Sequence, residues 1–349
     1  MDPLEHLQML KDSAAGIAPR KGDLKRIRAL RFSEPGFDRE TWRKMCEMGW
    51  LGIRVAEDAG GSGLGCREFC GLAEELGAGL TPEPLIPAAM AACLLPADHL
   101  PEVLAGERIV LPAWQEQPNS LSLSGETVLR DGKLTGRKIF VQMAAGADAF
   151  LVTVPGGLAL VERDAQGLHL ETQPTQDGGN FGTLVLDNAP AEAIAGDARD
   201  ALEQTIMASS AYLLGLMDRA FAITLDYMKT REQFGQKIGS FQALQHRAAD
   251  MQIQVSLTKA VVNSASYALD NEPRLAARQA AVSRAKVRAA DAAMVVTRTC
   301  IQLHGGIGYT DAADIGLFLR KAMVLAPIYG SSSVHRTRFR TVAPEVVEE

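Results

Sequence analysis

The sequence predicts an α+β protein of several domains, in the order helices, β structure, helices. Two changes in composition indicate this order. Apolar residues recur every three or four positions from about residue 3 to 105, short alternating runs fill 107–190, and long runs rich in Ala, Leu, Met and Arg follow from about 196. We therefore expect three domains, over residues 1–106, 107–195 and 196–349.

Helical spacing in the first domain is clearest in "DRETWRKMCEMGWLGI" and "CREFCGLAEELGAGL". Between these two predicted helices lies a glycine-rich loop, "RVAEDAGGSGLG". A phosphate-binding loop needs a preceding buried strand and a Lys-Ser/Thr ending, and this loop has neither. We interpret it as a tight turn.

Turn signals in the second domain separate short alternating runs. Asp131-Gly132 in "ETVLRDGKLTGRKIFVQ" and Pro155-Gly156-Gly157 in "AFLVTVPGGLALVER" predict β-hairpins, and "GLHLETQ" and "TLVLDNA" add two strands. Closely spaced turns of this kind predict a small barrel or sandwich rather than alternating strands and helices.

Three long helical runs, 201–235, 241–270 and 273–306, dominate the third domain. Each has a wide apolar face with small residues, which favours close packing of long helices in a bundle. We see no internal repeat and no low-complexity segment.

The overall composition excludes several classes of protein. Hydrophobic residues make up 47% and charged residues 22%, which is ordinary for a globular chain, and the net charge of −6 gives no sign of nucleic-acid binding. No apolar window approaches the length of a membrane span, and the N-terminus lacks the apolar core of a secretory signal. The five cysteines form no CxxC pair, so we expect no metal site and a cytoplasmic location.

Residues 227–251, "YMKTREQFGQKIGSFQALQHRAADM", form the first segment that can carry chemistry. A long helix is predicted to end near Arg231, and the chain breaks at Gly235 and Gly239 before a helix restarts. At such a helix end the Arg231 guanidinium can fork onto a phosphate while Phe234 packs on a ring. On local grounds alone, a charge that complements the helix dipole is the favoured explanation of Arg231.

Residues 300–310, "CIQLHGGIGYT", form a second segment of this kind. A long helix is predicted to stop at the Gly305-Gly306 pair, with Gln302 in its last turn. Paired glycines let a ligand or another backbone come close, and the Gln302 amide offers both a donor and an acceptor. A glycine C-cap is the common structural explanation of such a pair.

Together, the order and spacing of these segments resemble the acyl-CoA dehydrogenase family over nearly the whole chain. "MGWLGIRVAEDAGGSGLG" and "LAEELGAGLTPEPL" are similar to its N-terminal helical domain, and "GRKIFVQMAAGADAFLVTV" to its middle β domain. "REQFGQKIGSFQALQHRAADM" and "QLHGGIGYTDAADIGLFLRKA" are similar to the two signatures of its C-terminal domain. The resemblance implies an N-terminal helical domain, a middle β-barrel domain and a C-terminal four-helix bundle, usually in a tetramer built as a dimer of dimers.

The resemblance also implies a reaction and a cofactor. In this family a carboxylate removes the α proton of an acyl-CoA thioester while the β hydrogen leaves as hydride to N5 of FAD, which gives a trans-2-enoyl-CoA. Arg231 and Phe234 are implied to touch the pyrophosphate and adenine side of a FAD held mainly by the neighbouring subunit. Gln302, Gly305 and Gly306 are implied to line the same adenosine end. FAD is therefore expected to be shared across a subunit interface.

The part of the family's site that holds the flavin ring is altered here. Members usually carry a Thr-Glu-Pro-Gly-Ala-Gly-Ser-Asp run on the β domain, whereas the corresponding region is "LPAWQEQPNSLSLSG". Beside flavin N5 the family places an aromatic residue followed two positions later by Ser or Thr. This chain has Phe140 and then Gln142.

The family's catalytic Glu is missing from both of its known positions. One follows the Tyr of a Tyr-Glu-Gly-Thr stretch, but here Tyr329 is followed by Gly330, which we align as a one-residue deletion. The other position falls at Thr205, early in the first long helix. Glu203 lies nearby, but two residues along a helix are about 200° apart around its axis, so we expect Glu203 to face elsewhere.

Two residues that follow Tyr329 are poor substitutes for the missing base. The Ser331 hydroxyl is far too weak a base, and we expect His335 to be a solvated or interface residue before it is a base. General base catalysis is typically worth 100-fold or more, roughly 3 to 6 kcal/mol. We therefore assign no catalytic residue to this chain, with Glu203 as the one weak candidate.

Three hypotheses follow from these sequence features. The leading one is a half-site subunit of a bacterial heterotetrameric (α2β2) acyl-CoA dehydrogenase for bulky substrates such as steroid side-chain CoA thioesters, in which a paralogous partner supplies the Glu. The alternative is a self-sufficient enzyme, such as a homotetramer, that uses a displaced base such as Glu203. The third is a scaffold that binds neither FAD nor acyl-CoA. For the first two, we expect electron-transfer flavoprotein as the electron acceptor, with no nucleic acid or membrane among the partners.

Overall fold

The chain is described by a computed structural model over residues 3–343, with side chains from residue 7 onward. By internal packing it divides into two compact units. The first unit comprises Met1–Leu24, Cys66–Thr81 and Ile206–Glu349, and the second comprises Lys25–Gly65 and Pro82–Thr205. The three domain boundaries expected from the sequence stay a prediction.

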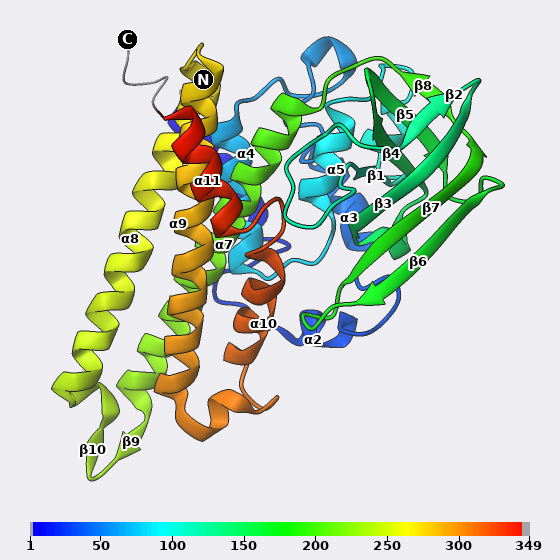
Figure 1. The fold of residues 1–349 in the computed structure, drawn as a ribbon. Helices are drawn as coiled ribbons and strands as arrows, with labels where there is room; N and C mark the ends of the chain where they lie inside the picture. Colours follow the sequence, from blue (N-terminus) through cyan, green and yellow to red (C-terminus); the bar gives the residue numbers. More distant parts are fainter. Residues whose placement is uncertain (1–2, 344–349) are drawn as a thin grey trace. The chain divides into compact units, whose positions relative to one another are not determined.

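The first unit is helical and contains the three long helices that the sequence predicts. Helices α8 and α9 pack side by side along their length, and the shorter α10 and α11 pack on α9 (Figure 1). Its elements are α1 (Pro3–Ala14), α4 (Cys66–Ala78), α7 (Arg199–Thr230, which begins in the second unit), β9 (Glu232–Gln233), β10 (Gln236–Lys237), η3 (Ile238–Ser240), α8 (Gln242–Asn271), α9 (Leu275–His304), η4 (Gly305–Tyr309), α10 (Ile315–Leu325) and α11 (Ser332–Val342).

Helices α4 and α7 approach each other so closely that only glycine fits at their contact. A Cβ added to Gly77 would lie 2.0 Å from the carbonyl oxygen of Tyr212, and one added to Gly215 would lie 1.7 Å from that of Glu74. Real Cβ atoms never come this near a backbone oxygen. Two small residues in the sequence thus fix the packing distance of these helices.

The N-terminus of α4 is capped from another helix. The backbone N–H groups of Cys66 and Arg67 donate to the two carboxylate oxygens of Asp270 on α8, at 2.7 and 3.0 Å. A carboxylate at this end satisfies free donors of the first turn and complements the helix dipole. This cap fixes the first turn of α4 to the last turn of α8.

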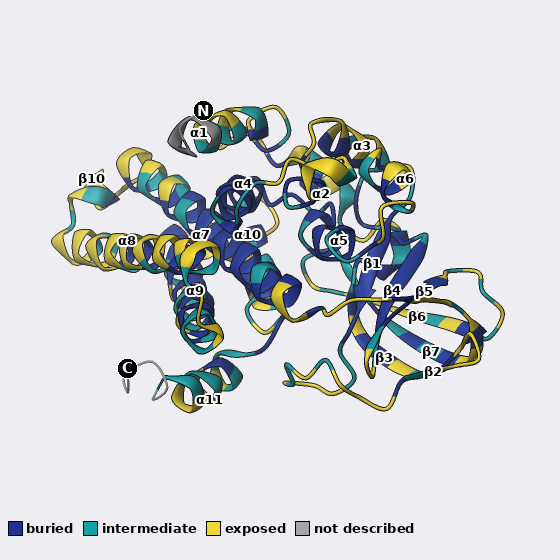
Figure 2. Cartoon of the chain, turned by 90° about the horizontal axis from the view of Figure 1, so that it is seen from above, coloured by how far each residue is buried: buried dark blue, intermediate teal, exposed yellow. Residues whose placement is uncertain are grey.

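Helix α7 is the one helix among the described residues that is long and apolar enough to cross a membrane by length and composition. Its most apolar window is 83% buried, and Figure 2 shows most of α7 in the colour of buried residues. Burial of this degree is that of a core helix.

The second unit combines short helices with the predicted β structure. Its helices are α2 (Lys25–Leu30), α3 (Arg39–Glu47), η1 (Glu57–Ala59), α5 (Leu85–Ala92), α6 (Leu100–Leu104) and η2 (Ala144–Gly146). Its strands are β1 (Val110–Ala113), β2 (Val128–Arg130), β3 (Lys133–Gln142), β4 (Ala149–Val154), β5 (Gly157–Glu162), β6 (Leu168–Pro174), β7 (Asn180–Pro190) and β8 (Glu192–Ile194).

Hydrogen bonds divide these strands into two four-stranded sheets, β1-β4-β5-β8 and β2-β3-β7-β6. Both predicted hairpins are present, since β2 pairs antiparallel with β3 around Asp131-Gly132, and β4 with β5 after Val154. Strand β1 pairs parallel with β4, which the turn signals did not indicate. The predicted order of helices, β domain and helical bundle is confirmed.

Candidate functional site

The end of the helical unit formed by the last turns of α7 and α9 holds all five predicted cofactor residues. The rings of Tyr227 on α7 and His304 on α9 stack with centroids 4.4 Å apart at 17°. The Tyr227 hydroxyl also donates to the His304 carbonyl at 3.3 Å. Because Arg231 follows Tyr227 by one helical turn and Gly305 follows His304 directly, this contact brings the two signature segments to one end of the bundle.

Arg231 lies between helix and hairpin. Its N–H donates to the Tyr227 carbonyl at 2.8 Å and thus completes the last turn of α7, while its own carbonyl accepts from the N–H of Ile238 at 2.9 Å. The side chain is exposed, and its guanidinium has no protein partner within residues 7–343. The backbone is therefore fixed on both sides while the charge stays available for an anion.

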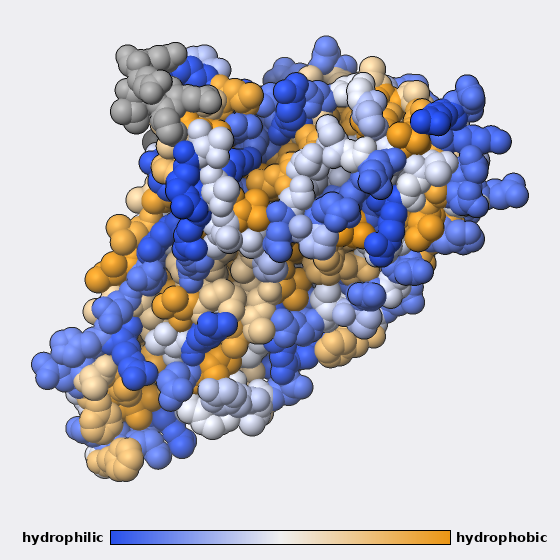
Figure 3. Space-filling view, viewed as in Figure 1, coloured by the Kyte–Doolittle hydropathy of each residue, from blue (hydrophilic) through white to orange (hydrophobic). Residues whose placement is uncertain are grey.

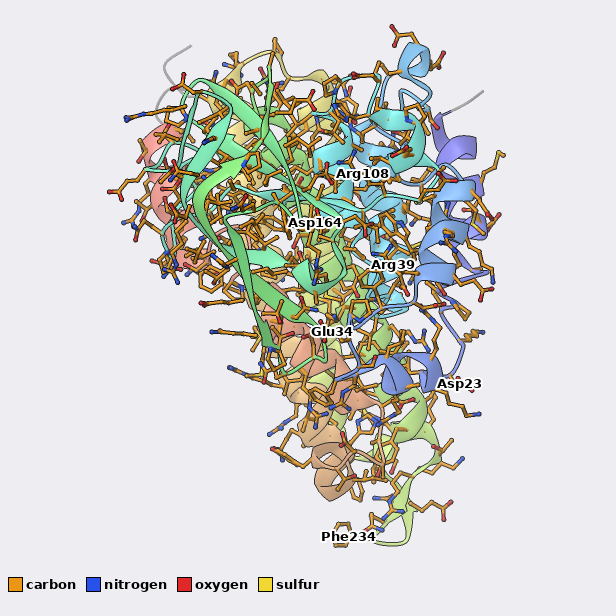
Figure 4. All side chains as sticks on the ribbon, turned by 90° about the vertical axis from the view of Figure 1, so that its right-hand side faces the viewer. Asp23, Glu34, Arg39, Arg108, Asp164 and Phe234 are labelled. Atoms are coloured by element: carbon orange, nitrogen blue, oxygen red, sulfur yellow. The ribbon has the colours of Figure 1, made fainter. Side chains whose placement is uncertain are left out.

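Phe234 occupies the turn of the β9-β10 hairpin, where the sequence predicts only a chain break. Its φ is +53° and that of Gly235 is +78°, a left-handed pair that allows the tight turn. The ring is 93% exposed and meets Phe241 edge to face at 6.3 Å. Figure 4 shows Phe234 projecting from the tip of this hairpin. The exposed ring offers an apolar face on which a planar ligand can pack.

Gln302, Gly305 and Gly306 are exposed at the end of α9. Gly305 has a φ of +67° and donates its N–H to the Gln302 carbonyl as the C-cap of the helix. A Cβ added to Gly305 or Gly306 would have no atom within 4 Å, so the space above this backbone is open. The cap explains Gly305, while the open space at both glycines lets a ligand approach the backbone.

Residues 329–331, where the family's catalytic Glu is expected, form a loop whose first two residues are buried. Tyr329 is 5% exposed with a φ of +58°, and the buried Gly330 follows it with a φ of +97°. Lys286 on α9 is fully buried, and its Nζ donates to the Leu325 carbonyl at 3.1 Å, where α10 ends. Burial lowers the pKa of Lys286 to about 7. Residues 329–331 carry no carboxylate.

The expectation that His335 is solvated or at an interface is wrong. Its exposure is 0%, because α11 turns this side chain onto α9. Its Nε2–H donates to the Tyr329 carbonyl at 2.8 Å, and Nδ1 faces the Ser283 hydroxyl at 3.4 Å. Burial lowers the pKa of His335 to about 3. One ring nitrogen thus contacts the Tyr329 loop and the other contacts α9, and neither is presented to a substrate.

We predict that His335 makes the folded state less stable as the pH falls. Its pKa is lowered in the fold to about 3, so between the ordinary value of 6.5 and that value the unfolded chain binds a proton that the native chain does not. From pH 6.5 to 5 this costs about 2 kcal/mol. Urea unfolding of the wild type and of His335→Gln at both pH values measures it. An equal pH dependence in the two proteins would contradict the prediction.

Thr205 and Glu203 both lie inside the protein, on the first turns of α7. They are 1% and 5% exposed, and the Thr205 hydroxyl donates to the Ala201 carbonyl at 2.6 Å. Both side chains are thus buried although they point to different sides of α7. The angle between them therefore does not make one of them exposed. Glu203 stays the one predicted weak candidate for a base.

Phe140 lies at a β-bulge in β3, where the pairing with β7 shifts between Lys138 and Val141. Its φ is +56°, an uncommon value for a large residue, and its half-exposed ring meets Phe181 edge to face at 5.9 Å. Gln142 pairs with Phe181 in the ladder. Such a bulge re-aims a side chain out of the sheet and is common next to functional sites.

A buried ion pair, which the sequence did not reveal, holds the segment that replaces the family's Thr-Glu-Pro-Gly run. The Nζ of Lys138 is 2.7 Å from a carboxylate oxygen of Glu116, and the Lys138 side chain is fully buried. Glu116 also accepts from the N–H groups of Glu126 and Thr127, at 2.6 and 3.1 Å. Desolvation raises the pKa of Glu116, but these hydrogen bonds outweigh it and bring the pKa to about 2. Glu116 therefore stays ionised and links Lys138 to the backbone of Glu126 and Thr127.

Within the described residues, no group of three or more His, Cys, Asp or Glu side chains is placed to hold a metal ion. The cysteines are all free.

Comparison with known proteins identifies the family. Residues 5–97 match the acyl-CoA dehydrogenase N-terminal domain, and residues 195–342 match the acyl-CoA dehydrogenase C-terminal domain. The chain is 30% identical to acyl-CoA dehydrogenase FadE27 of Mycobacterium tuberculosis, over 80% of this chain and 82% of that protein. It is 29% identical to acyl-CoA dehydrogenase IpdE2 of the same organism, over 92% of both chains. The chain belongs to the acyl-CoA dehydrogenase family, whose enzymes are FAD-dependent oxidoreductases.

Two solved structures are similar over nearly the full length. The steroid acyl-CoA dehydrogenase Tcur3481-Tcur3483, as a G363A variant, superimposes with a TM-score of 0.88 at 31% identity, covering 99% of both chains. The ChsE4-ChsE5 complex from Mycobacterium tuberculosis gives 0.86 at 25% identity, covering 99% of this chain and 98% of that one. Both are assemblies of two differently named chains.

Proposed function

We propose that this chain is one subunit of a heteromeric, FAD-dependent acyl-CoA dehydrogenase, in which it completes the FAD site of a paralogous partner and lacks a catalytic Glu of its own. One contrast carries the proposal. The five residues at the end of the bundle are exposed and open, whereas residues 329–331 are closed and contain no carboxylate. A chain that contributes to binding but not to proton abstraction fits this contrast.

The residues at the end of the bundle fit the adenosine and pyrophosphate part of FAD. Arg231 offers the phosphates a guanidinium that has no partner among the described residues, and the exposed Phe234 ring offers an apolar face for adenine. Gln302 can donate and accept, and the open backbone at Gly305-Gly306 admits the ribose. FAD held here would supply the hydride acceptor of the reaction. The residues of this chain bind and orient the cofactor, while the α proton goes to a carboxylate of the partner.

The proposed substrate class is a bulky acyl-CoA, such as a steroid side-chain thioester, and the proposed assembly is an α2β2 heterotetramer. Support comes from the two-chain steroid acyl-CoA dehydrogenase that this chain resembles at 31% identity. Electron-transfer flavoprotein is the proposed acceptor of the electrons, and the cytoplasm the proposed location.

The alternative is a self-sufficient enzyme with Glu203 as a displaced base. The observation in its favour is that Glu203 is 5% exposed, because a buried carboxylate is typical of a general base. Against it, Glu203 lies about 200° around the helix axis from Thr205, the position at which the family places a base in this helix.

Purification of the chain alone and after co-expression with a paralogous subunit that carries the Tyr-Glu-Gly-Thr stretch tests the proposal. Alone, the chain is expected to be colourless and inactive, and the co-expressed pair yellow and active on acyl-CoA. Full FAD occupancy and turnover by the isolated chain would overturn the proposal in favour of the alternative.

We predict that Glu203→Ala leaves the turnover of the co-expressed complex within about twofold of wild type, since an uninvolved side chain contributes nothing to the barrier. Loss of a general base costs about 100-fold or more, so the two outcomes are well separated. Steady-state kinetics together with the flavin absorbance of the variant complex measures this. Lost turnover at unchanged flavin content would identify Glu203 as the base.

A further inference from the structure

A groove between α9 and α11 is lined by arginines, and neither the cofactor site nor the Tyr329 loop uses it. Arg284 and Arg288 come from α9, and Arg336 and Arg340 from α11. The groove has a volume of about 610 Å³. In Figure 3 a strongly hydrophilic strip marks the exposed side of α11. All of these residues belong to the helical unit.

Two of the arginines are built into the walls. Arg288 donates through Nη2 to the side-chain oxygen of Gln254 at 2.8 Å and through Nε to the Thr258 hydroxyl at 3.2 Å, which fixes it against α8. Arg336 forms an ion pair with Asp291 across the groove. The walls are therefore held in place by polar contacts from three helices.

The other two arginines are accessible to a binding partner. Arg284 and Arg340 are exposed, and neither has a hydrogen-bond or ion-pair partner in the part of the chain between residues 7 and 343. Between the arginines, Val287 and Phe339 provide an apolar floor. Four arginines against the single carboxylate of Asp291 leave the groove strongly positive.

This composition favours a protein partner with carboxylates. Arginine is enriched at protein interfaces and forks onto carboxylates, and an apolar floor inside a charged rim is the usual anatomy of such a surface. A second copy of this chain is a poor occupant, because a two-fold contact would place the same arginines on both sides. Charge complementarity therefore favours an acidic segment, and the two-fold argument favours one on a different chain.

We infer that this groove binds an acidic segment of the paralogous subunit, with carboxylates on Arg284 and Arg340 and an apolar side chain between Val287 and Phe339. The inference rests on the proposed function, since it requires a heteromeric partner. It adds a reason why this chain assembles with a paralogue and not with itself.

The double variant Arg284→Glu/Arg340→Glu tests the groove. Both side chains lack partners within the described part of the chain, so the variant is expected to keep the melting temperature of the isolated chain. Its matched control, Arg43→Glu/Arg130→Glu, reverses two exposed arginines in the other unit. The probe is an affinity-tagged paralogous subunit, co-expressed with each variant, and the readout is the fraction that co-elutes together with the Kd of the purified pair.

The groove variant is expected to weaken assembly by about tenfold or more, and the control to leave it unchanged. Equal assembly of both variants would overturn the inferred binding role of the groove and leave the proposed function standing. A wild-type chain that self-associates alone, and loses this in the groove variant, would identify a second copy as the occupant and overturn the inference. Failure of the wild-type pair to assemble at all would overturn the proposed function and this inference with it.

Discussion

Arg231→Ala is expected to weaken FAD binding by the co-expressed complex by about tenfold or more, because one charge-assisted hydrogen bond to a phosphate is worth roughly 1.5 to 3 kcal/mol. Arg231 is suited to this effect since its backbone is fixed by two hydrogen bonds while its guanidinium has no partner within residues 7–343. Its removal leaves no protein group unsatisfied. The loss should therefore appear in cofactor binding and not in the stability of the chain.

The measurement is the ratio of flavin to protein absorbance after dialysis, followed by titration of the stripped complex with FAD. Lys229→Ala is the matched control, because Lys229 lies one residue before the end of the same helix and is 72% exposed, with only a loose contact of 3.9 Å to Asp226. Arg231→Lys, which keeps the charge but not the fork, is expected between the two. Wild-type FAD affinity in Arg231→Ala would contradict the assignment of this end of the bundle to the cofactor.

Local turn chemistry explains which parts of the fold the sequence predicts. Asp131-Gly132 specifies a two-residue hairpin by its own backbone preferences, and the hairpin is present with β2 and β3 on either side. The parallel pairing of β1 with β4 joins Val110 to Ala149, and no local signal records it. Non-local strand pairing depends on packing of the whole unit and so escapes a reading of short segments.

The candidate site also combines features that the local sequence indicates with features that distant packing decides. The helix ends at Arg231 and at Gly305-Gly306 can be predicted because helix stops and glycine pairs are local features, whereas their role toward FAD rests on the family resemblance and stays a prediction. The exposed Phe234 ring depends on a hairpin with residues in positive φ, which the sequence did not indicate. His335 is predicted wrongly, since the expectation came from the course of the corresponding helix in the family and not from the packing of this side chain. Its burial is decided by α9, to which it is linked through Ser283, 52 residues earlier.

The Glu116–Lys138 pair gives the clearest test of a contact that sequence patterns do not reveal. Glu116→Gln is expected to lower the free energy of unfolding by about 3 to 5 kcal/mol, because it leaves the fully buried Lys138 without a counter-charge. Gln keeps the size of the side chain, so the loss reports charge and hydrogen bonding to the N–H groups of Glu126 and Thr127. Urea unfolding at pH 7 measures it.

A surface pair in the same unit provides the control for this change. Glu192 is 55% exposed and lies 3.2 Å from His99, and Glu192→Gln is expected to cost less than about 1 kcal/mol.

Glu116→Gln/Lys138→Met, which removes both charges, should recover most of the stability, because the penalty lies in the unpaired cation. The pair also makes the fold less stable in acid: the pKa of Glu116 is lowered to about 2, so its contribution is present above about pH 4.5 and is lost as the pH falls toward 2. Equal costs for the buried and surface variants would show that Glu116 does not hold the loop that replaces the family's flavin-ring segment.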